Sequence, residues 1–240
     1  MDSVTSFNTA FIPYLPQISS VTQTFICLTC PACDMIKSIM ETVLKNDLTQ
    51  FLKALNFSAE KHRHQRRKDS SASPYINHPI EVANVLWTIG EVCDETAIIA
   101  ALLHDTLEDT DATAEDICSH FGEEVKALVL EVSDDKNLPK QERKQNQILH
   151  SSHLSQRAKQ IKLADKICNV HDIAFAPPGN WPLQRRTEYL QWAQAVVHGL
   201  RGTNQQLEAY FDETLIKARQ KLVDEQESSM HYSAVNPSTL

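Results

Sequence analysis

A run of apolar residues that abruptly becomes polar constrains this chain more than any other feature. Residues 100–110 read Ala-Ala-Leu-Leu-His-Asp-Thr-Leu-Glu-Asp-Thr, which predicts a buried helix that carries acids. His104 and Asp105 are neighbours, so on a helix they point about 100° apart and can flank one ion beside it. Glu108 and Asp109 follow one turn later on the same two faces. The run therefore offers two metal ligands and two carboxylates that could act on a bound water.

An isolated His–Asp pair is more often the solvated end of a core helix than a metal site. Two further polar residues change that balance. His78 precedes Pro79, which fits the first turn of a helix, and the imidazole is free to point inward. Asp165 lies inside an apolar stripe, where a carboxylate is costly unless it is paired or bound to metal. The alternatives to metal binding are a purely structural role for His78 and a salt bridge from Asp165 to Lys162 or Lys166.

Together, His78, His104, Asp105 and Asp165 form a set of two imidazoles and two carboxylates. Such a set suits Mn²⁺, Fe²⁺, Co²⁺ or Zn²⁺ and is a poor cage for Ca²⁺. An ion of this kind lowers the pKa of the water that it binds. The acidic pair one turn further on could orient that water or carry its proton. The implied reaction class is metal-assisted hydrolysis of a phosphate or pyrophosphate ester.

Basic residues and histidines crowd the end of a helix that the apolar period predicts from Leu48 to about Lys68. In a chain of formal net charge -8, which argues against general nucleic-acid or anionic-membrane binding, such a cluster is conspicuous. It is either a solvated helix face or a binding surface for a multiply charged phosphate ligand, and both interpretations stay open. Its members are Lys61, His62, Arg63, His64, Arg66, Arg67 and Lys68.

The fold class follows from the spacing of apolar residues and from the small number of glycines. With 5 Gly in 240 residues and apolar residues every three to four positions, the chain is predicted to be all-α, a single helical bundle. We expect one domain over residues 46–222, after a mostly irregular N-terminal extension over 1–45 with a helix near 34–45, and before a disordered polar tail over 223–240. The period predicts helices over about 48–68, 79–90, 95–109, 113–121 and 155–173, among others.

Three cysteines in the N-terminal extension, Cys27, Cys30 and Cys33, form a C-x-x-C-x-x-C pattern. They could hold zinc, although zinc normally takes four ligands, or form a redox pair, or be incidental thiols. The N-terminus has neither the basic start of a secretory signal nor an Arg-rich presequence. No run approaches the ~18 apolar residues of a membrane span. We therefore expect an intracellular, cytoplasmic protein without a membrane partner.

The motifs of this chain resemble those of the HD-domain phosphohydrolases, and most of all the hydrolase domain of the RelA/SpoT enzymes in its short animal form. The resemblance extends from about Leu48 to Leu215. It rests on five stretches, Arg67-Lys68, Tyr75-Ile-Asn-His-Pro79, Ala101-Leu-Leu-His-Asp-Thr-Leu-Glu-Asp-Thr110, Asp134-Asp-Lys136 and Leu163-Ala-Asp-Lys166.

The resemblance implies a fold, a reaction and a set of residues. Members of this family are HD-type helical domains that use one Mn²⁺ per chain to hydrolyse the 3′-pyrophosphate of ppGpp or pppGpp, which yields GDP or GTP and pyrophosphate. The animal form is also associated with removal of the 2′-phosphate of NADPH. By the same resemblance, the metal ligands are His78, His104, Asp105 and Asp165, the catalytic pair is Glu108 and Asp109, and the substrate contacts are Arg67, Lys68 and Asn169.

Two features qualify the expectation. His171 stands where the family often has Arg, so one substrate contact is in question, and no synthetase domain follows, so we expect hydrolysis without synthesis. The partner expected is a small nucleotide rather than a nucleic acid, and the oligomeric state is left open. NADPH or another nucleotide as the main substrate is the alternative within enzymes. An inactive nucleotide-binding protein is the alternative outside them, and the complete ligand set argues against it.

Overall fold

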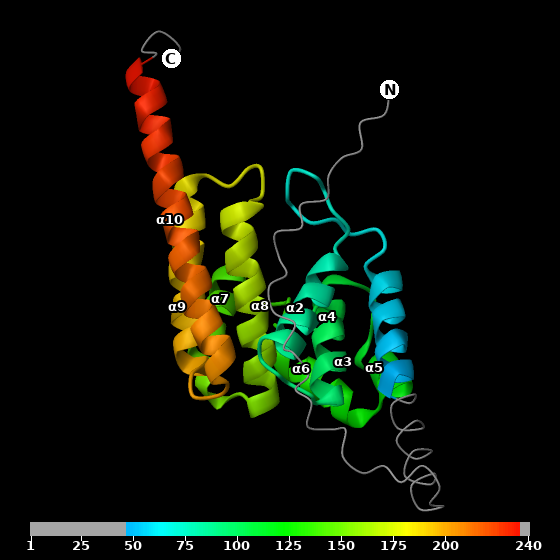
Figure 1. The fold of residues 1–240 in the computed structure, drawn as a ribbon. Helices are drawn as coiled ribbons and strands as arrows, with labels where there is room; N and C mark the ends of the chain where they lie inside the picture. The colour runs from blue at the N-terminus through cyan, green and yellow to red at the C-terminus, as the bar shows by residue number, and fades with distance from the viewer. Residues whose placement is uncertain (1–46, 236–240) are drawn as a thin grey trace, which may run out of the picture. The chain divides into compact units, whose positions relative to one another are not determined.

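The chain folds into helices gathered around one long central helix, α8 (Figure 1). The structure is a computed structural model that describes residues 47–235, with side chains through residue 228. The helices cover residues 47–61, α2 Asn77–Thr88, α3 Glu95–Leu103, α4 Thr106–Asp109, α5 Ala114–Phe121, α6 Glu123–Val132, α7 Lys140–His150, the 3-10 helix η1 Ser151–His153, α8 Gln156–Phe175, α9 Leu183–Leu200 and α10 Gln205–Val235.

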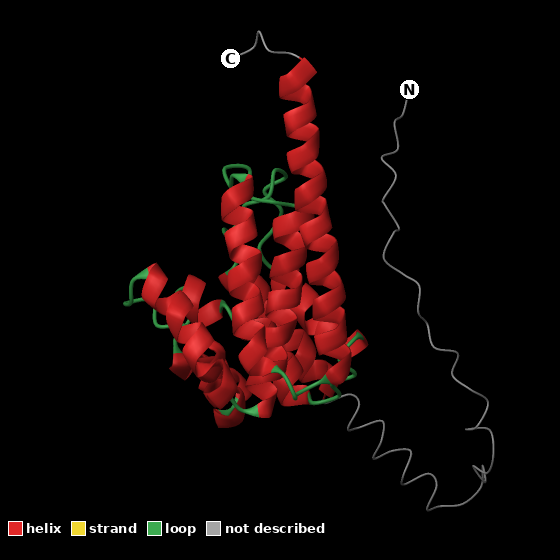
Figure 2. Ribbon diagram, turned by 90° about the vertical axis from the view of Figure 1, so that its left-hand side faces the viewer, coloured by secondary structure: helices red, strands yellow, loops and turns green. Residues whose placement is uncertain are grey.

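The prediction of an all-α fold is confirmed, since the described residues form helices and loops without a named strand (Figure 2). The predicted helix near 34–45 and the cysteines of the N-terminal extension lie outside the described residues. None of the described helices is both long and apolar enough to cross a membrane.

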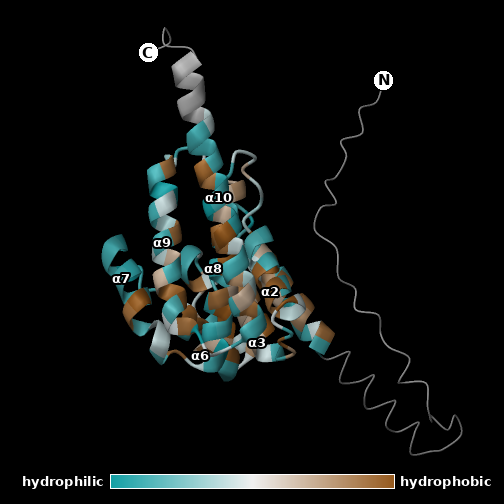
Figure 3. Ribbon diagram, turned by 60° about the vertical axis from the view of Figure 1, so that its left-hand side comes forward, coloured by the Kyte–Doolittle hydropathy of each residue, from teal (hydrophilic) through white to brown (hydrophobic). Residues whose placement is uncertain are grey.

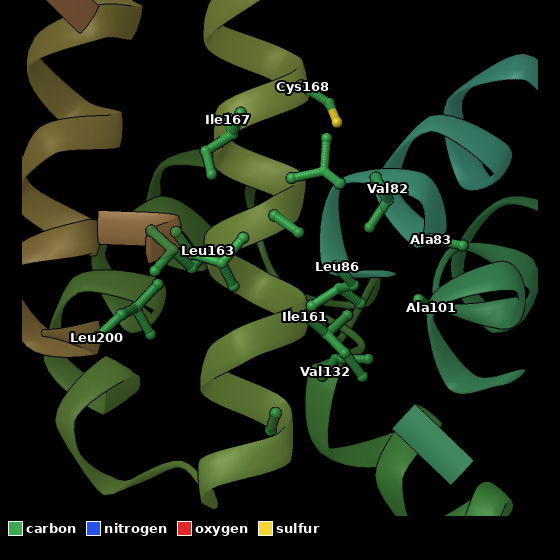
Figure 4. Packing of buried hydrophobic residues seen from close by; sticks show 14 of the residues in the cluster. Val82, Ala83, Leu86, Ala101, Val132, Ile161, Leu163, Ile167, Cys168 and Leu200 are labelled. Atoms are coloured by element: carbon green, nitrogen blue, oxygen red, sulfur yellow. The ribbon is translucent and has the colours of Figure 1, made fainter. Parts of the chain in front are cut away.

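The core is built on both sides of α8, which contacts α2, α3 and α6 on one side and α9 and α10 on the other (Figure 1). Ile161 of α8 lies beside Leu86 of α2 and Val132 of α6 (Figure 4). All three side chains are at most 2% exposed. Hydrophilic residues cover the outside of α7, which has no fully buried residue (Figure 3). Apolar burial on both sides of α8 is what places polar residues of that helix deep in the domain.

The predicted continuous helix over residues 95–109 is wrong, because the chain turns at His104 and Asp105. Helix α3 ends at Leu103 and α4 begins at Thr106. Asp105 has φ -96° and ψ -5°, a conformation typical of turns. The Thr106 hydroxyl donates to the Leu103 carbonyl at 2.6 Å and so satisfies a backbone group that the helix end would leave free. The turn changes the direction of the His104 and Asp105 side chains relative to Glu108 and Asp109, compared with a continuous helix.

The predicted helix over 48–68 is also too long, since it ends at residue 61. After it the chain forms a loop whose two sides are joined by backbone hydrogen bonds. The Tyr75 N–H donates to the Gln65 carbonyl at 3.2 Å, and the Arg67 N–H donates to the Ser73 carbonyl at 2.8 Å. Most of the basic cluster therefore lies on a loop that folds back beside the site. By contrast, the predicted cap of α5 is confirmed, with Thr113 and Asp116 bonded reciprocally as a capping box.

The last helix, α10, continues through Val235, where a disordered tail was expected from residue 223. The polarity of this segment suggested disorder, but residues 205–235 contain neither Gly nor Pro, and an ion pair holds the helix to the domain. Arg186 of α9 is 5% exposed and donates to the Ile173 and Ala174 carbonyls at 2.8 and 2.9 Å. It also donates to Glu225 of α10 at 2.6 Å. One guanidinium thus links α8, α9 and α10.

We expect Arg186→Leu to lower the free energy of unfolding by about 3 kcal/mol, because it leaves two buried carbonyls without their donor. Urea unfolding followed by circular dichroism measures the change. The matched control is Arg201→Leu, since Arg201 makes an exposed ion pair with Asp212 and should cost less than about 1 kcal/mol. Equal effects of the two substitutions would show that the buried contacts of Arg186 do not stabilise the fold.

A close approach of α9 to η1 requires Gly199. A Cβ atom there would lie 2.0 Å from the hydroxyl oxygen of Ser151, which is buried, and 3.0 Å from the Ser152 backbone nitrogen. We expect Gly199→Ala to lower the free energy of unfolding by at least about 1 kcal/mol. Gly179→Ala is the matched control, since nothing lies within 4 Å of the added methyl group, and its melting temperature should match the wild type. An unchanged melting temperature for Gly199→Ala would contradict this close approach of α9 to η1.

Candidate metal centre and active site

Three side chains from different parts of the fold meet at one point inside the domain. His78 comes from the first turn of α2, His104 from the turn after α3, and Asp165 from the middle of α8. Each offers one ligand atom, and the three atoms lie within 4.8 Å of one another. Asp165 Oδ1 is 3.1 Å from His78 Nε2 and 3.8 Å from His104 Nε2. All three residues are buried, so a metal ion here would be held by groups already withdrawn from water.

The hydrogen bonding of His104 presents one ring nitrogen to this cluster. Its Nδ1–H donates to the Ala101 carbonyl at 2.8 Å, which leaves the Nε2 lone pair facing His78 and Asp165 in the neutral ring. Nε2 is buried and has no hydrogen-bond partner among the described residues. A backbone bond on the far nitrogen is the usual support of a metal-ligating histidine. The residues present therefore fit a divalent transition metal.

Asp105 lies beside the same three side chains. Its Oδ2 is 3.2 Å from His104 Nε2 and 3.8 Å from His78 Nε2. The Tyr75 hydroxyl donates to that oxygen at 2.6 Å and fixes the carboxylate toward the cluster. Burial lowers the pKa of His104, but the carboxylates of Asp105 and Asp165 outweigh it and raise this pKa to about 9. The local field thus favours a positive charge, either a proton or a metal ion.

Asp165 also has structural partners, as the alternative from sequence anticipated. Its Oδ2 accepts from Lys166 Nζ at 2.7 Å, and its Oδ1 accepts from the Asn169 amide at 2.6 Å. Burial opposes ionisation of Asp165, yet the Lys166 charge and the facing histidines hold its pKa well below the usual range. The salt bridge and the metal-competent position are thus compatible, because they use different oxygens of one carboxylate.

The two acids predicted to act on water occupy different environments. Glu108 is mostly buried, and burial, Asp105 and Asp134 raise its pKa to about 7. Its Oε1 accepts from the Asp134 backbone N–H at 2.8 Å. Asp109 is held from two sides, by Lys136 Nζ at 2.5 Å on Oδ1 and by the Gln65 amide at 3.2 Å on Oδ2. One acid is therefore poised to exchange a proton near neutral pH, while the other is fixed in orientation.

A cavity of about 410 Å³ lies beside this region. Among its lining residues are His78, Asp109 and all three predicted substrate contacts, Arg67, Lys68 and Asn169. Arg67 is ion-paired with Asp172 and stacks over the Tyr75 ring, so it is fixed rather than free to move.

A second cavity, of about 620 Å³, shares Trp181 and Tyr189 with the first. It is basic and aromatic. Lys144 Nζ lies 4.7 Å from the Trp192 ring centre, and the Arg185 guanidinium lies 4.0 Å from that of Trp181. Burial and neighbouring cations lower the pKa of Lys144. An anionic ligand there would relieve the repulsion between these cations, and a planar ring could stack on the aromatic side chains.

The HD domain family matches residues 54–194 of the chain, a segment that contains the whole cluster and both acids. The chain belongs to the HD-domain family. A protein of Xenopus tropicalis named guanosine-3′,5′-bis(diphosphate) 3′-pyrophosphohydrolase MESH1 is 52% identical to it over 169 residues, which are 70% of this chain and 94% of that protein. The human protein of the same name is 50% identical over 163 residues, which are 68% and 91% of the two chains.

A solved structure described by the words "A metazoan ortholog of SpoT hydrolyzes ppGpp and plays a role in starvation responses" is 48% identical in sequence. It superimposes with a TM-score of 0.69 over 70% of this chain and 94% of the other. These matches confirm the HD fold and the resemblance to the short animal members of the RelA/SpoT family.

The HD domain contains functional candidates that sequence reasoning missed. Tyr75 was quoted only as part of a motif, but its hydroxyl holds Asp105. Asp172, which pairs with Arg67, lies seven residues after Asp165 and therefore on the same face of α8, a spacing that could have signalled it. Nothing in the local sequence signalled the aromatic residues of the second cavity. At His171, where the family often has Arg, the ring Nδ1 lies 3.5 Å from Asp172 Oδ1.

Proposed function

We propose that this HD-domain protein hydrolyses the 3′-pyrophosphate of ppGpp or pppGpp to GDP or GTP and pyrophosphate, with one Mn²⁺ per chain. The observation that carries the proposal is the meeting of His78, His104 and Asp165 beside a cavity that His78 lines together with Arg67 and Lys68. The proposal is supported by relatives of 50–52% identity that are named as such hydrolases. Asp105, beside both imidazoles, completes the proposed ligand set.

A bound divalent ion would supply a Lewis acid and a water of lowered pKa. The protein supplies the rest. Glu108, when ionised, accepts a proton from the attacking water, whose oxygen forms a bond to phosphorus as the ester bond to the ribose O3′ breaks. The released O3′ takes a proton from solvent and Glu108 returns its proton to solvent, so atoms and charge balance over the turnover. Asp109, held by Lys136, orients the water, and Arg67 and Lys68 bind the pyrophosphate oxygens.

The test is pyrophosphate release from ppGpp by the purified chain, with and without Mn²⁺. Asp105→Ala serves as the control for the site. We expect Mn²⁺-dependent release that the substitution removes. Release that survives Asp105→Ala would mean that another site or a contaminant is responsible.

The same assay run on NADPH, with phosphate as the product, separates the two nucleotide activities. If the Mn²⁺-loaded protein releases phosphate from NADPH but no pyrophosphate from ppGpp, NADPH replaces ppGpp as the proposed substrate. Binding of Mn²⁺ and nucleotide without turnover of either would identify an inactive nucleotide-binding protein.

A further inference from the structure

His62 is a buried titratable residue that the proposed reaction does not use. It follows the helix over residues 47–61 and was grouped by sequence with a basic cluster on a solvated or phosphate-binding face. The structure contradicts that grouping for this one residue, because the side chain is 1% exposed. Its Nδ1 lies 2.7 Å from Gln65 Oε1, while its Nε2 is buried without a hydrogen-bond partner. A buried imidazole in this environment requires an explanation other than surface charge.

The first link from His62 leads to Asp109. The Gln65 amide nitrogen donates to Asp109 Oδ2 at 3.2 Å, and a carboxylate can only accept there. The other end of the amide, Oε1, must therefore accept from His62, which places the proton of the imidazole on Nδ1. Burial lowers the pKa of His62 and keeps the ring neutral, as this arrangement needs. With Lys136 on Oδ1, both oxygens of Asp109 then have a donor.

The second link leads to Asp105. The His62 ring packs against the Tyr75 ring, with centres 4.8 Å apart and planes tilted by 30°. Tyr75 donates its hydroxyl to Asp105 at 2.6 Å, and its backbone N–H donates to the Gln65 carbonyl. His62 therefore contacts the two side chains, Gln65 and Tyr75, that hold one acid each.

We propose that His62 is a positioning residue that acts through Gln65 on the carboxylate of Asp109 and through Tyr75 on that of Asp105. The inference rests on the proposed hydrolysis, in which both carboxylates must be held in a productive orientation. Loss of orientation at a reacting centre lowers the rate even when binding is kept. The hydrogen bonds of the His62 and Gln65 side chains lead to each other and to Asp109 rather than to a ligand atom of the cluster, so the role is indirect.

The decisive variants change hydrogen bonding with little change in volume. We expect Gln65→Met and His62→Leu each to lower kcat for ppGpp about tenfold, with KM within about twofold, as for other supports of catalytic groups. The double variant should lose no more of kcat than the more affected single variant, because both substitutions break the same chain of contacts. His62→Asn, whose amide nitrogen can replace Nδ1–H, should restore most of kcat. Ser58→Ala is the matched control, since Ser58 is fully buried one turn before His62.

A second readout does not depend on turnover. Nitrogen-15 NMR of the metal-free chain should show His62 as the Nδ1–H tautomer, and Gln65→Met should shift that signal. If the wild type does not hydrolyse ppGpp, the proposed function fails, and the tautomer alone then supports or overturns the link between His62 and Gln65. An Nε2–H tautomer would overturn it. So would additive losses in the double variant, or a loss of kcat in Ser58→Ala as large as that in His62→Leu.

Discussion

His104→Asn is expected to remove Mn²⁺ binding and with it nearly all hydrolysis of ppGpp. The asparagine amide can replace the Nδ1–H that bonds the Ala101 carbonyl, but it has no atom at the position of Nε2, which faces His78 and Asp165. Losing a support of a metal ligand costs about 10- to 100-fold in affinity, so losing the ligand itself should cost at least about 100-fold. Mn²⁺ titration followed by electron paramagnetic resonance, with pyrophosphate release in parallel, measures both effects.

His120→Asn is the control for that experiment. The exposed His120 makes the same kind of bond, from Nδ1 to the Asp116 carbonyl at 2.8 Å, but lies on α5 outside the cluster. It should leave Mn²⁺ affinity and kcat unchanged. Unaltered Mn²⁺ binding in His104→Asn would remove this histidine from the ligand set and require another arrangement of the site.

Glu108→Gln is expected to lower kcat by about 10²- to 10⁴-fold, the range typical of a general base. The amide oxygen can still accept from the Asp134 N–H, so the side chain should keep its place. In the wild type, kcat should rise with pH through an apparent pKa at or below about 7, since burial and neighbouring carboxylates raise the pKa of Glu108 and a bound cation would lower it. A pH–rate profile with Mn²⁺ present tests this. A rising limb that persists in the variant would assign it to another group.

The same substitution should stabilise the metal-free protein above neutral pH. A carboxyl whose pKa rises from 4.5 to about 7 on folding binds its proton more tightly in the folded state, so stability falls as pH rises between those values. Glutamine has no charge to bury, and we expect Glu108→Gln to raise the free energy of unfolding by about 3 kcal/mol at pH 8 but not at pH 4. Lower stability of the variant at pH 8 would show that Glu108 makes favourable contacts when ionised. A gain in stability with a loss of activity would mark Glu108 as a residue retained for function.

Much of the fold could be predicted because apolar periodicity and capping residues are local in the sequence and indicate where helices lie and begin. The apolar repeat of α8 and the Thr113–Asp116 capping box were visible in the sequence, and both are present in the structure. The errors arose where a side chain or a distant contact ends or extends a helix. The Thr106 hydroxyl bonds to the Leu103 carbonyl at the turn that interrupts the predicted central helix, and the pairing of Arg186 with Glu225 accompanies a helix that continues where a tail was expected.

The helical class, the chemistry of the candidate ligands and the family could all be predicted from the sequence, because residue type, spacing and motif are properties of the chain. Which of these groups meet depends on how the helices pack. His78 and Asp165 are 87 positions apart and come within 3.1 Å because α2 and α8 pack against each other. Burial was decided in the same way. His62 and Arg63 are neighbours in one charged run, yet packing withdraws the first from water and leaves the second exposed, because a side chain's surroundings depend on which helices cover it.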